Sequence, residues 1–393
     1  MTTDISARER TISGATADPG AIVDLSVWHA RLPVTAPRGH GIGTVQTASD
    51  HVFLRLTSES GLQGWGEGSP WVVFTGTAEA NFAALDRHLR PLVVGRDPRR
   101  ISEIMADADR ALVGHPEAKA ALETALLDLV GQAAGLPVAE LLGGRCRDTI
   151  PLSFSVANPD FDADHALVGG LYGAGIRLFK LKTGFAGHAF DVMRLERIRK
   201  DFPEADLRVD YNQGLKPHEA LRTLRDIEAF APTFIEQPVP RAARGAMAAI
   251  TAATDTPILA DESVFSPQEA ITAIRDGLCD LISVKIMKSG SLRASQTVAA
   301  IAAAEGMACY GGDMFESGIA HLAGTHMIAA TPNISLGCEF YQALWYLAED
   351  VLQSPFPVEN GAVVVPTAPG LGIAADEARI ARYAVAHASG GRS

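Results

Sequence analysis

The sequence predicts an α/β protein, with a β/α barrel in the second half of the chain and an α+β domain before it. Two observations predict the barrel. From residue 150 onward, short apolar runs alternate with amphipathic or alanine-rich stretches, and ionisable residues recur near the ends of these runs at steps of 24 to 28 residues. A step of that size accommodates one strand, one helix and two loops. A third observation, β-rich patterning followed by strong helical patterning before residue 145, predicts the other domain.

The first 145 residues begin with a polar segment, and we expect residues 1–20 to be a flexible leader. Residues 22–67 are β-rich and predict a hairpin that turns at 59–61, whereas the Gly- and Pro-containing stretch 34–45 predicts a loop. Helical patterning covers about 77–91, and a strong helix followed by a shorter one is predicted between 115 and the pair Gly143-Gly144. Residues 21–145 are therefore predicted to form one α+β domain.

The remaining chain carries the pattern of a barrel. Eight apolar runs separated by short crossovers favour a closed barrel over an open sheet, and no G-x-G-x-x-G follows any of them. The barrel is predicted at 146–340, and the tail 341–393 is expected to return and complete the first domain. The predicted strands are 151–157, 176–182, 206–211, 233–237, 257–261, 281–287, 306–311 and 334–340.

The composition excludes several classes of function. The formal net charge is −12 and no Lys/Arg-rich run occurs, so we expect neither nucleic acid nor an anionic membrane as a partner. No uninterrupted apolar stretch is long enough for a membrane helix, and the N-terminus has no apolar signal-peptide core. The four cysteines are scattered without a C-x-x-C pair, which indicates reduced thiols and a cytoplasmic protein.

Five charged residues define the predicted site. Lys182, Asp210, Glu236, Asp261 and Lys285 lie at or near the ends of successive predicted strands. In a closed barrel these ends converge on one rim, so the five side chains should share a pocket. Three carboxylates at close range repel one another unless a cation joins them, and hard oxygen ligands suit Mg²⁺ or Mn²⁺. The sequence thus predicts one divalent ion per subunit, flanked by two lysines.

Neighbouring residues extend this prediction. Lys180 and Lys182 lie on one face of a strand, and two adjacent ammonium groups should lower each other's pKa and favour a neutral amine that accepts a proton. Ion pairing of one of them, or a counter-ion role for Lys285, is the alternative. Lys288 is expected outside the pocket or at its rim. Asn212 and Glu262 are expected to support the metal ligands from the second layer.

These residues resemble the enolase superfamily, in particular its muconate lactonizing enzyme subgroup. The resemblance rests on the K-x-K pair, the Asp/Glu/Asp series and the lysine in VKIMKSGS, and also on GWGEG (64–68), PVAELLGG (137–144) and PTAPGLGI (366–373). It implies a modified (β/α)₇β barrel with an α+β capping domain, a bound Mg²⁺ or Mn²⁺, and proton transfer next to a substrate carboxylate. It also implies that Lys182 is the main acid/base, that Lys285 faces it, and that Lys180 tunes Lys182 or contacts the carboxylate.

The segments that would select the reaction depart from the subgroup pattern. CYGGDMFESGIA (309–320) resembles Y-G-G-T-M-L-E-G-S-I-G and places Glu316 at the matching glutamate, but Asp313 stands where the pattern has threonine. SLGCEFYQALW (335–345) resembles G-T-E-L-F-G-P-L and places Glu339 at its glutamate. An extra carboxylate should repel a dicarboxylate such as muconate and could instead bind a cationic amino group, unless Asp313 only hydrogen-bonds loop amides.

The resemblance also assigns specificity to two loops of the first domain, residues 37–40 and 68–74. Arg38 and His40 could read a distal carboxylate, and Trp71 and Phe74 could form an apolar wall. Solvated side chains at Arg38 and His40 are the alternative.

The function predicted on these grounds is a cytoplasmic isomerase that forms and quenches an enolate next to a carboxylate, with muconate cycloisomerisation as the leading reaction. We also expect a small carboxylate substrate and a homo-oligomer. A racemase, epimerase or dehydratase of an amino-acid derivative is the alternative within the subgroup. A Schiff-base lysine barrel and a non-catalytic binding protein are the alternatives from other classes.

Overall fold

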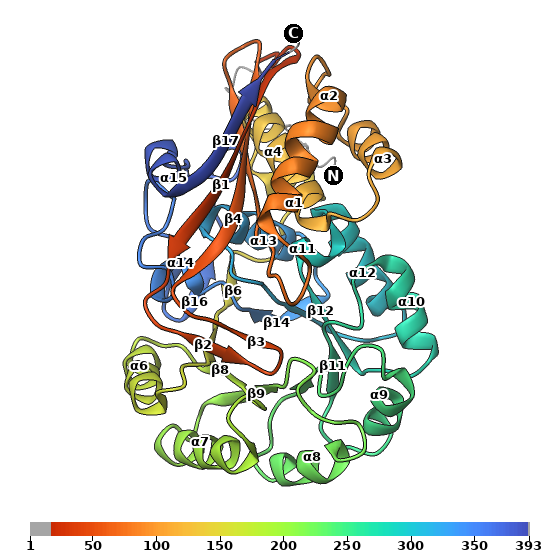
Figure 1. Ribbon diagram of the computed structural model, residues 1–393, viewed down its shortest axis with the longest axis vertical. Helices are drawn as coiled ribbons and strands as arrows, with labels where there is room; N and C mark the ends of the chain where they lie inside the picture. The colour runs from red at the N-terminus through yellow and green to blue at the C-terminus, as the bar shows by residue number, and fades with distance from the viewer. Residues whose placement is uncertain (1–16, 392–393) are drawn as a thin grey trace, which may run out of the picture.

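The computed structural model describes residues 17–391, and residues 1–16 and 392–393 lie outside this range. Most of the predicted leader, residues 1–20, therefore lies outside the described residues. The described chain has two parts: a cap built on an antiparallel sheet, in the upper half of Figure 1, and a barrel of parallel strands below it. Among the described residues, no helix is long and apolar enough to cross a membrane.

Eight parallel strands form the barrel, and they neighbour one another in the order in which they occur along the chain. A bridge between Leu152 and Cys338 joins the first strand to the last, so the barrel is nearly closed. Each strand lies within a predicted apolar run. The strands are β7 (Ser153–Val156), β8 (Leu178–Lys182), β9 (Asp206–Asp210), β10 (Ile235–Glu236), β11 (Ile258–Ala260), β12 (Leu281–Val284), β13 (Cys309–Gly311) and β14 (Ile334–Cys338).

A helix follows each of the first seven strands, whereas the last is followed by the four-residue α14 (Gln342–Trp345). This confirms the predicted (β/α)₇β barrel. Side-chain caps at Asp160, Ser266 and Ser291 fix three of the helix starts, because each side chain accepts a hydrogen bond from a free backbone N–H of the first turn. The helices are α6 (Phe161–Gly173), α7 (His188–Asp201), α8 (Ala220–Glu228), α9 (Arg244–Thr251), α10 (Pro267–Arg275), α12 (Leu292–Ala304) and α13 (Gly318–Ala329).

The cap is a four-stranded antiparallel sheet with helices packed on it. Its order is β17 (Ala384–Gly390), β1 (Ile22–Pro33), β4 (Ala48–Ser58) and β5 (Gln63–Gly68), so the end of the chain pairs with its beginning. The predicted turn at 59–61 is confirmed, with Gly61 at φ +84°. Helix α4 (Pro116–Ala134) crosses β5 so closely that a side chain at Gly66 would collide with the Ala121 carbonyl oxygen, which explains the glycines of GWGEG.

The remaining cap helices follow the predicted pattern in part. The short helix α5 (Val138–Leu141) ends before Gly143 and Gly144, as predicted. The helix predicted over 77–91 is a chain of three pieces, α1 (Ala78–Ala83), the π-helical η1 (Ala84–Leu89) and α2 (Arg90–Val93). Helix α3 (Ile101–Ala111) was not predicted.

One expectation about an irregular segment needs correction, whereas the expected return of the tail to the cap is confirmed by β17. The stretch 34–45 is not only a loop, since β2 (Arg38–His40) and β3 (Gly43–Val45) pair as a small antiparallel hairpin. The tail also serves both parts of the molecule: β17 joins the cap, but β15 (Val358–Glu359) and β16 (Ala362–Val364) pair with β6 (Thr149–Pro151) at the start of the barrel. The boundaries 21–145, 146–340 and 341–393 remain predictions.

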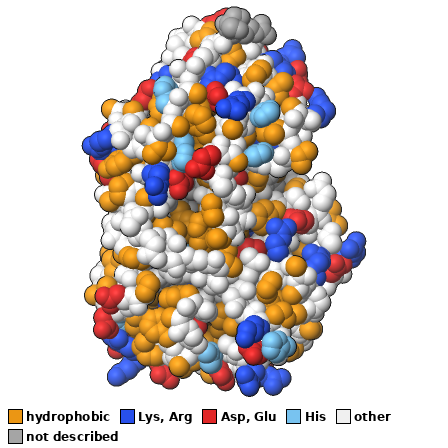
Figure 2. All heavy atoms as spheres, in the orientation of Figure 1, with side chains coloured by type: hydrophobic (Ala, Val, Ile, Leu, Met, Phe, Trp, Pro, Cys, Tyr) orange, Lys and Arg blue, Asp and Glu red, His pale blue; other side chains and the backbone are white. Residues whose placement is uncertain are grey.

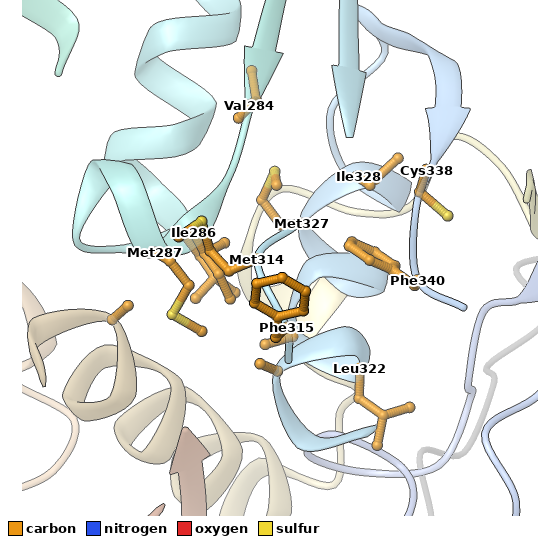
Figure 3. Close-up of a cluster of buried hydrophobic side chains, with 14 of the residues drawn as sticks. Val284, Ile286, Met287, Met314, Phe315, Leu322, Met327, Ile328, Cys338 and Phe340 are labelled. Atoms are coloured by element: carbon orange, nitrogen blue, oxygen red, sulfur yellow. The ribbon is translucent and has the colours of Figure 1, made fainter. Parts of the chain in front are cut away.

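Buried apolar side chains run continuously through the cap and the barrel. Figure 3 shows the part of this core around the end of β13, where Met314 and Phe315 lie close to Ile286 and Met287 on one side and to Phe340 on the other. On the face seen in Figure 2, acidic and basic side chains are scattered among groups of hydrophobic ones. The packed core holds the segment after β13 firmly against the barrel rim.

Candidate active site

The five charged residues predicted from the spacing do gather at one rim of the barrel. Lys182, Asp210 and Glu236 are the last residues of β8, β9 and β10, and Asp261 and Lys285 directly follow β11 and β12. All five are buried, and the three carboxylates are fully so. Parallel strands that twist around one axis bring these ends together, which is why regular spacing in sequence becomes proximity in space.

The lysines bind the carboxylates directly. Lys182 Nζ lies 2.7 Å from Asp210 Oδ2, and Lys285 Nζ lies 2.6 Å from Asp261 Oδ2. Lys180 Nζ lies 2.8 Å from Glu236 Oε2 and 3.5 Å from Asp210 Oδ2. The acidic series therefore has one acid/base candidate on β8 and another beyond β12.

A divalent cation fits the acidic side of this arrangement. Glu236 Oε1 and Glu262 Oε2 are buried and have no hydrogen-bond partner among the described residues. Burial, with the nearby charge of Asp210, raises the pKa of Glu236 to about 7, and burial with the charge of Asp261 raises the pKa of Glu262 to about 8. Buried carboxylates that lack donors are costly, and a hard cation would supply the missing positive charge.

The two adjacent lysines were expected to lower each other's pKa, but at Lys180 the neighbouring acids have the larger effect. Burial lowers the pKa of Lys180, but the charges of Glu236 and Glu339 outweigh burial, and the pKa lies well above its usual value. Glu339 Oε2 is 2.6 Å from Lys180 Nζ. The carboxylates around Lys180 thus keep it protonated, which the argument from two adjacent lysines did not include.

Lys288 also differs from the expectation, because it lies inside the site. Its Nζ donates to Asp261 Oδ1 at 2.7 Å, to the Asp261 carbonyl at 2.7 Å and to the Ser283 carbonyl at 2.8 Å. The predicted strand 281–287 ends at Val284, and a helical turn, α11 (Ile286–Ser289), follows. That turn brings residue 288 back over the strand end, beside Asp261.

The predicted supporting residues Asn212 and Glu262 contact each other. Asn212 Nδ2 lies 3.3 Å from Glu262 Oε1, and its backbone N–H donates to Asp210 Oδ1 at 2.7 Å. Asn212 has φ +40°, which turns the chain sharply after β9 and aims this N–H back at the carboxylate. Asn212 therefore links one predicted metal ligand to a neighbouring acid.

Three further acids lie on the seventh and eighth strand ends. Glu339 accepts from Ser155 and contacts Lys180, and it is 3.9 Å from Lys182, so it belongs to the centre of the site. Asp313 and Glu316 lie beyond β13 and are buried. Oxygens of these two acids and a nitrogen of His321 lie within 4.8 Å of one another.

The cap contributes two segments at the rim, residues 37–40 and 68–74. The surroundings of Arg38, in the first segment, differ from those that we predicted. Arg38 is 2% exposed, pairs with Asp164 at 3.2 Å, and lies near the rings of Phe154, Tyr341 and Tyr346. Its charge is already matched, which argues against a role in reading a distal substrate carboxylate.

His40 and Trp71 lie together, as part of an aromatic group. The His40 ring is 5.1 Å from Trp71 and 5.4 Å from Phe315, and Trp71 is 5.2 Å from Phe315. Burial and the nearby Lys182 hold the pKa of His40 well below its usual value, so its ring is neutral. Phe74 lies over Lys285, 5.0 Å from its Nζ. The cap thus places neutral rings beside both acid/base candidates.

The chain is similar to known proteins whose families are built from the same two parts. Residues 22–143 match the mandelate racemase / muconate lactonizing enzyme N-terminal domain, and residues 165–379 match the enolase C-terminal domain-like family. L-Ala-D/L-Glu epimerase of Bacillus subtilis (strain 168) is 34% identical over 362 residues, which is 90% of this chain and 96% of that protein. Muconate cycloisomerase 1 of Pseudomonas putida is 32% identical over 374 residues, 92% of this chain and 97% of that protein.

A solved structure is also similar to this chain over most of its length. The crystal structure of a muconate cycloisomerase from Azorhizobium caulinodans is 49% identical, with a TM-score of 0.81, and the match covers 93% of this chain and 98% of that one. Both domain models and these relatives span the cap and the barrel together. The chain therefore belongs to the mandelate racemase / muconate lactonizing enzyme family of the enolase superfamily, as an isomerase.

Proposed function

We propose that this isomerase transfers a proton at the carbon next to a substrate carboxylate, with Lys182 and Lys285 as the acid/base pair. The observation that carries the proposal is the placement of these lysines on two separate strand ends, each 2.6–2.7 Å from a different carboxylate of the acidic series. A substrate between them would present opposite sides of its reacting carbon to the two amines. Family membership and the names of the relatives support the same half-reaction.

Asp210, Glu236 and Asp261 would hold Mg²⁺ or Mn²⁺, which would supply positive charge for the substrate carboxylate. The lysines of the protein itself would carry out the proton transfer and stabilise the developing charge. In an epimerisation, Lys182 or Lys285 removes the proton and the other delivers it, whereas in a cycloisomerisation one of them transfers a single proton. A lysine that acts as a base must first release its carboxylate partner. Lys180, held protonated by Glu236 and Glu339, stabilises negative charge that develops on the substrate.

Muconate cycloisomerisation and epimerisation of an amino-acid derivative both use this step. The resemblance at the seventh and eighth strand ends and several relatives support the first. Two observations favour the second: Arg38 is already paired with Asp164, and Asp313 adds an acid where a second substrate carboxylate would bring another negative charge. A Schiff-base role is disfavoured, because imine formation on a lysine gives no role to the three buried carboxylates that gather beside the lysines.

Proton exchange in deuterated water tests the proposal. With Mg²⁺ or Mn²⁺ present, we expect deuterium to enter the carbon next to the carboxylate of a substrate, as followed by NMR. Lys182→Met and Lys285→Met should each slow turnover at least about 100-fold, as loss of a general acid or base does, whereas Lys216→Met, at an exposed position, should not. EDTA, Asp210→Ala and Glu236→Ala should abolish exchange, and the two substitutions should also remove bound metal.

Turnover that survives both lysine substitutions would overturn the acid/base assignment. Stoichiometric metal retained by both Asp210→Ala and Glu236→Ala would overturn the ligand assignment. A lysine adduct trapped by borohydride, with activity that persists in EDTA, would favour the Schiff-base alternative instead.

A further inference from the structure

The segment after β13 holds a buried acid that no basic side chain of the site neutralises. Asp313 is 6% exposed, and its Oδ2 has no hydrogen-bond partner among the described residues. The nearest ring nitrogen is His321 Nε2, at 3.5 Å. Burial lowers the pKa of His321 to about 4, so this histidine is neutral near pH 7 and brings no positive charge to Asp313.

The lysines of the site are already committed to other acids. Lys180 binds Glu236 and Glu339, Lys182 binds Asp210, and Lys285 and Lys288 bind Asp261. Among the described residues, no salt bridge joins any lysine to Asp313. A buried carboxylate with no cation is costly, and burial together with the charge of Glu339 raises the pKa of Asp313 well above its usual value. A cationic group next to Asp313 would favour its ionised form.

The overall charge of the pocket points the same way. Seven buried carboxyl groups and four buried lysines lie around the pocket. Burial, with the charge of a neighbouring acid, raises the pKa of both Asp313 and Glu316 well above the usual value. A second substrate carboxylate would add to this repulsion, whereas a cationic group would favour the ionised form of Asp313. The carboxyl groups belong to Asp210, Glu236, Asp261, Glu262, Asp313, Glu316 and Glu339, and the amines to Lys180, Lys182, Lys285 and Lys288.

Two residues of the cap and one of the segment after β13 together form an aromatic surface. His40, Trp71 and Phe315 form a cluster with ring centroids 5.1–5.4 Å apart, and Phe315 lies two residues beyond Asp313. Aromatic faces attract an organic cation, and a neutral imidazole does not repel it. The one guanidinium of the cap loops, Arg38, is paired with Asp164 and lies among three rings, so it offers no second anion site.

Building on the proposed function, we infer that the substrate carries a cationic nitrogen next to its carboxylate, and that Asp313 and the rings of His40, Trp71 and Phe315 receive this nitrogen. The substrate class is an α-amino acid with a protonated or alkylated amino group, not a dicarboxylate and not an N-acylated amino acid. The carboxylate lies at the metal ligands, the α-carbon lies between Lys182 and Lys285, and the nitrogen points to the segment after β13. Asp313 is then a specificity-determining residue.

A substrate panel with the Mg²⁺-loaded enzyme tests this inference. The panel is L-alanine, L-valine and L-proline, the N-acetyl derivative of each, and cis,cis-muconate, with α-deuterium exchange and calorimetric binding as the two measurements. We expect exchange and binding with at least one free amino acid and weaker binding of its N-acetyl partner. Asp313→Asn should reduce kcat/KM for the amino acid about 10- to 100-fold, mostly through KM, as loss of a charged hydrogen bond does.

Controls separate this inference from the proposed function and from misfolding. Asp313→Thr restores the residue of the subgroup pattern and should shift preference toward the uncharged or dicarboxylate ligands. Glu305→Gln, exposed at the opposite end of β13, should leave the preference unchanged. Bound Mg²⁺ per chain should be the same in all of these variants, because Asp313 is not one of the proposed ligands.

Several outcomes would overturn the inference. Preference of the unsubstituted enzyme for muconate or an N-acetyl derivative, with exchange still dependent on Lys182, would refute the substrate class while leaving the proposed function intact. Failure of every free amino acid to bind would also refute it. A second bound metal that disappears in Asp313→Asn would show that Asp313, Glu316 and His321 hold an ion rather than a substrate nitrogen.

Discussion

At the scale of single residues, this protein keeps several buried carboxyl groups without donors. Several of these groups lie at the candidate active site, but Glu117 lies apart from it, in the first turn of α4, with both side-chain oxygens buried and unpartnered among the described residues. Burial raises its pKa to about 7. The folded protein therefore binds this proton more tightly than the unfolded chain does.

Glu117→Gln should consequently change how stability depends on pH. Because the folded pKa lies above the unfolded one, Glu117 favours folding at pH 4 and loses that contribution as the pH rises through 7, by about 3–4 kcal/mol in total. Gln has the same shape and no proton to lose, so the variant should be more stable than the parent at pH 8 and similar at pH 4.5. Urea unfolding at both pH values measures this, and equal differences at the two pH values would contradict it.

At the scale of elements, the barrel was predictable and the rim details were not. Short apolar runs that alternate with helical stretches at regular spacing predict buried parallel strands, so all eight strands and the charges at their ends could be predicted from the sequence. The position of Lys288 inside the site could not be predicted, because nothing in SVKIMKSGS marks the point where the strand ends and the helical turn begins. The β2–β3 hairpin could not be predicted either, since its residues lack the alternation of apolar and polar side chains that is typical of a half-buried strand. The pairing of Arg38 with Asp164 joins the cap to α6 across 126 residues, beyond any local pattern.

The β2–β3 hairpin depends on close backbone approach to the barrel. Gly41 lies in its turn, and a Cβ there would collide with the Tyr211 carbonyl oxygen and press on Gly214, in the loop after β9. Gly41→Ala should push the hairpin, and His40 with it, away from the rim. We expect KM to rise about tenfold or more with a smaller change in kcat, as loss of positioning does, and little change in the unfolding midpoint.

Gly245→Ala is the matched control for Gly41→Ala. Gly245 lies in α9 with open space around its Cα, so the added methyl group should leave kinetics unchanged and stabilise the helix by about 0.5–1 kcal/mol. Normal kinetics in Gly41→Ala would mean that the hairpin does not position substrate.

At the scale of the whole molecule, the cap and the barrel share one buried joint. Glu67, in β5 of the cap, accepts hydrogen bonds from Ser317 N (2.8 Å), Ser317 Oγ (2.6 Å) and Ala320 N (2.9 Å) at the start of α13 in the barrel. His51 Nδ1 lies 2.8 Å from the same carboxylate. Burial alone would raise the pKa of Glu67, but the contacts with His51 and Ser317 outweigh it and lower the pKa, so Glu67 is a carboxylate.

Glu67→Gln therefore tests whether this joint sets the geometry of the segment that carries Asp313 and Glu316. An amide places an N–H₂ group where donors already point, so at least one of the bonds to Ser317 or Ala320 must break, at a cost of about 1–3 kcal/mol for each buried donor left unpaired. We expect a lower urea midpoint, and in the folded variant weaker substrate binding with unchanged metal content. Ser49→Ala, one step further out at Ser49 Oγ···His51 Nε2 (2.7 Å), should have a smaller effect on both. Loss of stability without any change in substrate binding would mean that Glu67 only joins the two parts, and that Asp313 is positioned by the barrel alone.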